Sequence, residues 1–170
     1  VYVPSSGGND AWDGLSPTTP KRTIAAGKAL LGHLQPDWLL LKRGDVWNES
    51  LGQWSKSGRS QDEPMVVAWY GTAAARPKLL TGIDDGVNTS GGGGSPAVIE
   101  NVAFVGLHFF ANTYDGTTNS VGARILQPGK HLLLEDCCFQ GYHTNLVLQG
   151  YGGTHEDLRV RRCVVIDAWA

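Results

Sequence analysis

The most regular feature of the chain is an eight-residue pattern of apolar positions that occurs three times, at Val102–Phe109, Leu132–Phe139 and Leu158–Val165. In each copy the first, third, sixth and eighth positions are apolar. The first and third positions predict a short strand with one buried face, and the step to the sixth position predicts a bend before a second short strand. The copies begin 30 and then 26 residues apart, a repeat length typical of β-solenoids.

A further strand is expected before each pair, at Ala97–Glu100, Gly122–Gln127 and Asn145–Gln149. The fold class predicted is therefore all-β, a right-handed parallel β-helix with three strands in each coil of 26 to 30 residues. The repeat is expected to begin in the N-terminal half, because Asp37–Gly44 aligns with Pro64–Gly71 at an offset of 27 residues.

The N-terminal part predicts one amphipathic helix, from Thr23 to Leu34, with Thr23 as its N-cap and Pro36 ending it. Such a helix is placed where a solenoid needs a cap over its open end. Asp10 and Asp13, in the turn-rich segment before it, are expected to accept hydrogen bonds from nearby backbone amides rather than to bind a cation.

These elements indicate a single domain over residues 1–170, with a strand, loop and cap helix in 1–36 and coils in 37–170. The last coil, near residues 164–170, is followed by no polar capping element, so we expect a domain that is incomplete at its C-terminus or that pairs there with another subunit. A homo-oligomer through residues 158–170 is the corresponding prediction.

Composition narrows the class of partner. The chain has 23 glycines and 18% charged residues, which favours a turn-rich β protein. Its net charge of −2 gives no reason to expect nucleic acid or an anionic membrane as a partner. It has no apolar run long enough to span a membrane. No signal peptide is recognised at Val1, which suggests a mature or trimmed chain.

The three cysteines, Cys137, Cys138 and Cys163, do not have metal-binding spacing. Cys137 and Cys163 hold the same position in successive repeats, which allows either a ladder of buried free thiols or a disulfide.

The segment Ser90–Ser95 (SGGGGS) is either a natural glycine-rich loop or an engineered linker, and it lacks the residues of a phosphate-binding loop.

Several segments carry a family resemblance: VYVP at 1–4, GND at 8–10, DGLSP at 13–17, LLLKRGDVW at 39–47 and WYG at 69–71. They resemble the secreted parallel β-helix proteins of the pectate-lyase-like superfamily. The resemblance implies a polysaccharide partner, an extracellular or periplasmic location, and calcium as a cofactor of many lyases in that superfamily. No acidic cluster recurs at one stacked position here, so we assign no metal ligand and no catalytic residue.

The candidate substrate-binding residues fall into three groups. Glu100, Gln127 and Gln149 are expected to stack at one position of the first sheet, as ligand contacts or as a hydrogen-bond ladder. Arg124 and His143 are ionisable groups nearby in the sequence. Trp47 and Trp54 could stack on sugar rings or pack a loop onto the body of the protein.

Two functions follow as hypotheses. The first is a secreted protein that binds polysaccharide or acts on it as a lyase or glycoside hydrolase. The alternative is a non-catalytic structural or adhesion module that assembles through its C-terminal end.

Arg159, Arg161 and Arg162 are expected to be a solvated strand face that pairs with Glu135 or Asp136 of the preceding coil.

Overall fold

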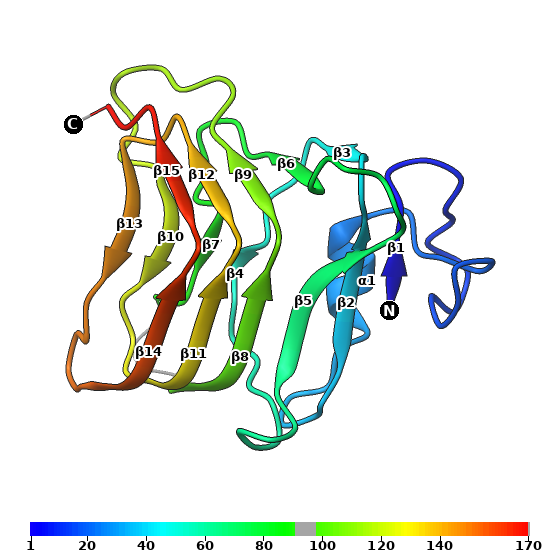
Figure 1. The fold of residues 1–170 in the computed structure, drawn as a ribbon, viewed down its shortest axis with the longest axis horizontal. Coiled ribbons are helices and arrows are strands. Elements are labelled where there is room, and N and C mark those ends of the chain that lie inside the picture. The colour runs from blue at the N-terminus through cyan, green and yellow to red at the C-terminus, as the bar shows by residue number, and fades with distance from the viewer. Residues whose placement is uncertain (91–97, 170) are drawn as a thin grey trace.

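The computed structural model describes residues 1–90 and 98–169, and within them the strands form three parallel sheets (Figure 1). Residues 91–95 of the glycine-rich segment lie outside the described residues, as does Ala97 of an expected strand. The first sheet has the order β1-β2-β5-β8-β11-β14, the second β3-β6-β9-β12-β15, and the third β4-β7-β10-β13. The expectation of an all-β chain of parallel strands is confirmed.

The strand bounds in the first sheet are β1 Tyr2–Val3, β2 Trp38–Lys42, β5 Met65–Tyr70, β8 Ile99–Val105, β11 Gly129–Glu135 and β14 His155–Arg161. Those in the second sheet are β3 Val46–Trp47, β6 Lys78–Leu80, β9 His108–Phe110, β12 Cys138–Gln140 and β15 Val164–Ile166. Those in the third sheet are β4 Gly52–Gln53, β7 Val87–Asn88, β10 Val121–Ile125 and β13 Thr144–Leu148. From β2 onward the chain passes through the first, second and third sheets in that order, repeatedly.

The eight-residue pattern aligns in space as the sequence predicts. Leu132 lies opposite both Val102 and Leu158 in the first sheet. Phe139 lies opposite both Phe109 and Val165 in the second sheet. The rings of Phe109 and Phe139 stack with centroids 5.2 Å apart, so each inward position of one coil packs on the same position of the next.

The bend within each pattern is made by one residue in the left-handed region. Gly106, Asp136 and Arg162 have φ values of +68°, +53° and +51° and follow equivalent strands of the first sheet. This conformation turns the chain sharply from the first sheet into the second. Glycine adopts it without strain, whereas Asp136 and Arg162 hold it at some cost in conformational energy.

The N-terminal helix is shorter than expected. α1 spans Ile24–Ala29, and Thr23 is its N-cap as predicted, with the Thr23 hydroxyl accepting a hydrogen bond from Ala26 N at 3.1 Å. A Cβ atom at Gly27 would lie 2.6 Å from the Val3 side chain and 2.8 Å from that of Leu39, so this glycine permits close packing of α1 on β1 and β2. The helix ends five residues before the expected Leu34, and a capping helix is not evident.

Two strand predictions need correction. The N-terminal alignment is wrong by one residue, because Trp38 pairs with Val66 and Leu39 with Val67, an offset of 28. The expected strand ending at Glu100 is not a separate element, since Glu100 belongs to β8 of the first sheet. The other two expected strands correspond to β10 and β13, which lie in the third sheet.

Candidate functional site

The two candidate tryptophans lie in the core. Trp47 is 3% exposed and Trp54 is 0% exposed. The indole Nε1 of Trp54 donates to the Lys56 carbonyl at 2.8 Å, and its ring meets Phe104 edge-on at 5.3 Å between centroids. Neither ring can stack on a sugar, so the packing alternative holds for both.

The stacked position expected for Glu100, Gln127 and Gln149 does not exist. Glu100 lies in β8 opposite Lys130 of β11. Gln127 and Gln149 follow β10 and β13 of the third sheet, and Gln149 N donates to the Ile125 carbonyl at 2.8 Å. The prediction was wrong because it aligned a residue of the first sheet with residues that follow strands of the third sheet.

Arg124 forms an ion pair inside the structure. Its Nε donates to Asp85 Oδ2 at 2.7 Å and its Nη2 to Asp85 Oδ1 at 3.1 Å. The side chains are only 20% and 16% exposed. Arg124 therefore connects β10 to the segment before β7, a contact that accounts for this arginine without a ligand.

His143 does not line a cleft itself, but it lies next to Tyr114, which lines a cleft that the sequence did not predict. Its ring lies 6.4 Å from that of Tyr114, and Tyr114 is stacked with Trp169 at 6.1 Å and an interplanar angle of 26°. The cleft has a volume of about 530 Å³. Its lining residues come from the ends of β9 and β12, the loop after β9 and the segment after β15: Phe110, Ala111, Asn112, Tyr114, Gln140, Gly141, Asp167, Ala168 and Trp169.

A row of hydrogen bonds joins two lining residues, Gln140 and Asp167, to His108, which lies behind them and does not line the cleft. His108 Nε2 and Gln140 Oε1 are 3.1 Å apart, and Gln140 Nε2 donates to Asp167 Oδ2 at 3.0 Å. Burial, followed by the nearby Lys78 ammonium, lowers the pKa of His108 below its ordinary value. The neutral ring with a proton on Nε2 donates to Gln140 Oε1, which orients the Gln140 amide toward Asp167.

The cleft thus combines aromatic faces with amide and carboxylate groups. Tyr114 is half-buried, whereas Trp169 is 60% exposed. Asn112 and Asp167 are exposed and can exchange hydrogen bonds with a polar ligand. Among the described lining residues Asp167 is the only carboxylate.

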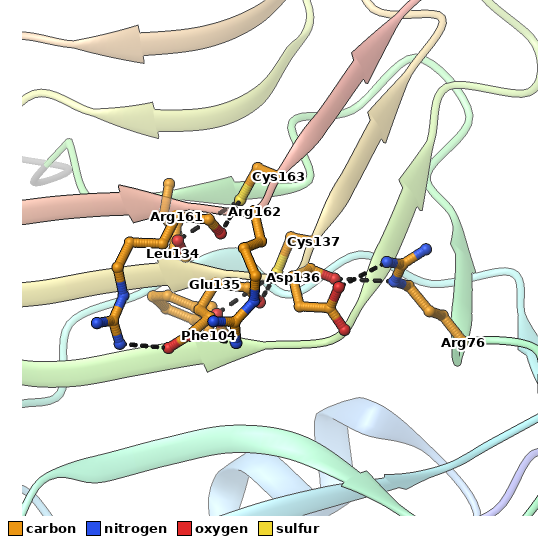
Figure 2. A network of polar contacts seen from close by, with 9 residues as sticks. All are labelled: Arg76, Phe104, Leu134, Glu135, Asp136, Cys137, Arg161, Arg162 and Cys163. Carbon is orange, nitrogen blue, oxygen red and sulfur yellow. Dashed lines mark hydrogen bonds and ion pairs between the residues drawn. The ribbon is translucent and has the colours of Figure 1, made fainter.

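Two arginines of the last coil, Arg161 and Arg162, pair with Glu135 as predicted, whereas Arg159 pairs with Asp157 of its own strand. Arg161 Nη2 lies 2.7 Å from Glu135 Oε2, and Arg162 contacts the other oxygen of the same carboxylate. Figure 2 shows Glu135 between these two arginines, with Asp136 bound at 2.7 Å by Arg76 on its other side. Arg161 and Arg162 therefore form ion pairs between the last coil and the preceding one.

The cysteines are free thiols, and Cys137 is buried. The register of the flanking strands places Cys137 opposite Cys163, so the ladder of thiols is the arrangement found. Within residues 1–90 and 98–169 no three His, Cys, Asp or Glu side chains gather where they could hold a metal ion. Calcium, which the resemblance implied, stays an untested prediction.

No helix in the described part of the chain is long and apolar enough to cross a membrane.

In the turn-rich N-terminal segment, Asp10 Oδ1 accepts hydrogen bonds from Arg22 N at 2.8 Å and Thr23 N at 2.9 Å, and Asp13 Oδ1 accepts one from Leu15 N at 3.0 Å. Both aspartates bond backbone amides, as predicted.

Comparison with known proteins gives a likeness in structure alone. No protein-family model and no curated protein matches the chain. The native crystal structure of GH136 lacto-N-biosidase from Eubacterium ramulus is similar, with a TM-score of 0.58 and 18% identity over 96% of this chain. Its selenomethionine derivative has a TM-score of 0.53 and 19% identity over 98% of this chain. The chain spans 30% of the length of either one.

The resemblance to the pectate-lyase-like superfamily is therefore wrong. The similar solved structures are those of a glycoside hydrolase, and the described strands form three all-parallel sheets without clearly specifying a right-handed parallel β-helix. Part of the motif set behind that resemblance, Arg43-Gly44-Asp45, lies at the turn between β2 and β3. Turn residues reflect local backbone requirements that unrelated parallel folds share.

Proposed function

We propose that this chain is a glycan-binding module of a carbohydrate-active protein and that the cleft between Tyr114, Gln140 and Trp169 holds the sugar. The observation that carries the proposal is the stacked pair of half-buried Tyr114 and exposed Trp169, beside the row from His108 to Asp167. Aromatic faces pack against the C–H faces of sugar rings, and amide and carboxylate groups bond their hydroxyls. The likeness to a glycoside hydrolase agrees with this class of ligand.

The test is calorimetric titration of the 170-residue chain with a panel of oligosaccharides that includes lacto-N-biose. We expect saturable binding of at least one neutral glycan. Trp169→Ala should weaken it by about 2 kcal/mol, or roughly 30-fold in Kd, as for other aromatic residues at the centre of an interface. Gln140→Leu should weaken it too, because it leaves Asp167 and His108 without their common partner.

Trp38→Ala is the matched control, since Trp38 is also an exposed tryptophan but lies in β2, in a different sheet from the cleft. Binding that Trp38→Ala reduces as much as Trp169→Ala would contradict the cleft as the site. Absence of binding across the panel would contradict the function itself.

A second candidate, the structural or adhesion module that assembles with itself, is favoured by the last coil. β13, β14 and β15 are each the outermost strand of their sheet among the described residues. Val160 and Val165 continue the inward columns above Leu134 and Phe139, yet they are 39% and 49% exposed. Strand edges with exposed apolar residues are surfaces on which another chain can pair.

We further propose that the stacked coils close into a parallel β-helix, with right-handed connections. The support is the fixed order in which the chain visits the three sheets and the strong preference for right-handed crossovers between parallel strands. An extracellular or periplasmic location belongs to the same proposal, because glycans that such a module would bind are found there.

A further inference from the structure

A second cavity lies on the first sheet, away from the proposed glycan cleft. It has a volume of about 180 Å³ and spans β8, β11 and β14. Asn101, His131 and Asp157 occupy equivalent positions on these three strands, with φ values of +57°, +53° and +57°. Because the left-handed turn recurs at one level of the stack, the three polar side chains lie in one row along the cavity.

The next row of the cavity is apolar except at its end. Ala103, Leu133 and Arg159 pair across β8, β11 and β14. Gln61 and Pro64, from the segment before β5, also line the cavity. The cavity therefore has an apolar floor and a polar rim of a few converging side chains, the usual composition of a small-ligand site.

Asp157 uses both of its oxygens within this cluster. Oδ2 lies 3.0 Å from His131 Nδ1, and Oδ1 accepts a hydrogen bond from Arg159 Nε at 2.6 Å. The hydrogen bond from His131, followed by that from Arg159, lowers the pKa of Asp157, so this carboxylate is ionised at neutral pH. Its role in the cluster is to orient the imidazole and the guanidinium.

The donors that remain for a ligand come from Arg159, Asn101 and Gln61. Arg159 keeps its two terminal nitrogens, and Asn101 and Gln61 supply side-chain amides. The charged neighbours offset each other, since Lys130 pairs with Glu156 at 3.1 Å and Arg59 with Glu63 at 2.9 Å. A guanidinium presented as a fork matches the two oxygens of a carboxylate or sulfate.

We propose that this cavity binds an oxyanion, a carboxylate or sulfate group, held by the Arg159 guanidinium with the Asn101 and Gln61 amides beside it and the His131 ring at its edge. The site is independent of the glycan cleft, because it lies on the first sheet and shares no lining residue with it. The anion is either free in solution or carried on a sugar, and the two sources are distinguished by experiment.

The test is an NMR titration of the whole chain that follows the His131 ring and the Arg159 Nε–H, with sodium sulfate, sodium glucuronate and neutral glucose as separate probes. We expect saturable shifts with an anion and none with glucose. Saturation by both anions identifies the oxyanion alone as the ligand, whereas saturation by glucuronate only identifies an acidic sugar. Arg159→Gln should raise the Kd at least about 10-fold, as loss of a charge-assisted hydrogen bond does.

Arg162→Gln is the control, because Arg162 is a more exposed arginine of the same coil and does not line the cavity. The proposal is overturned if neither anion gives a saturable shift, if glucose binds equally, or if Arg162→Gln weakens binding as much as Arg159→Gln. Trp169→Ala should leave anion binding unchanged, so failure of this site and failure of the glycan cleft give different results.

Discussion

Cys163 and Cys137 show how one position in the stack produces two different thiols. Figure 2 shows the two residues on neighbouring coils. The neighbouring Cys137 thiol lowers the pKa of the partly exposed Cys163 thiol below its ordinary value. The same contact, with burial, raises the pKa of Cys137, and burial raises that of Cys138.

We therefore expect iodoacetamide to modify Cys163 first at about pH 7, because the thiolate is the reactive form and its population rises as pH rises through the thiol pKa. Peptide mass spectrometry across a pH series measures the rate at each cysteine. Cys137→Ala removes this neighbouring thiol and should slow the reaction of Cys163 at neutral pH. Equal labelling of all three cysteines would show that the thiols do not differ in this way.

Whether an individual side chain is buried or exposed was the property hardest to predict from the sequence. Trp47 and Trp54 lie in a polar segment, yet that segment also contains Leu51 and the short strand β4, which fold it onto the core. Phe110 and Gln140 directly follow the inward Phe109 and Phe139, so strand alternation could have placed both outside. Nothing local in the sequence places Tyr114 next to Trp169, because their contact depends on tertiary folding of a loop.

At the scale of elements, strands that recur with a repeated core pattern could be predicted, and isolated short ones could not. The copies at β8–β9, β11–β12 and β14–β15 align without a slip. The alignment of β2 with β5 was wrong by one residue, because the run of apolar residues in each strand lacks the alternation that specifies register. β4 and β7, with two residues each, carry too little pattern to be recognised.

The ion pair between Arg124 and Asp85 is the clearest test of how elements are held together. Asp85 also accepts hydrogen bonds from Val121 N and Asn88 Nδ2, each at 2.7 Å. Asp85→Ala leaves the largely buried guanidinium without its partner, so we expect the free energy of unfolding to fall by about 3 kcal/mol. Urea unfolding followed by circular dichroism measures this change.

Glu63→Ala provides the matched comparison, because the Arg59–Glu63 pair is i,i+4 and both side chains are 49% exposed. Its loss should cost less than about 1 kcal/mol. Equal destabilisation by the two substitutions would mean that the Arg124–Asp85 contact does not join β10 to the segment before β7.

At the scale of the whole molecule, the sheets run from the N-terminal strands to the last coil, with the two termini at opposite ends (Figure 1). If the exposed Val160 and Val165 pair with another copy, the mass measured by light scattering should rise with protein concentration. Replacing both with Lys should return it to the monomer mass of 18.2 kDa, because like charges then face each other across the contact. A concentration-independent monomer mass for the unchanged chain would exclude assembly through this end.

The central claim, that the Tyr114–Trp169 cleft binds a glycan, is tested most directly by the indole N–H resonances of the six tryptophans during titration with the oligosaccharide panel. We predict that the Trp169 resonance shifts and saturates while those of the buried Trp47 and Trp54 stay in place, together with those of Trp12, Trp38 and Trp69. A saturable shift at another tryptophan with Trp169 unmoved, or no shift at any of the six, would contradict the claim.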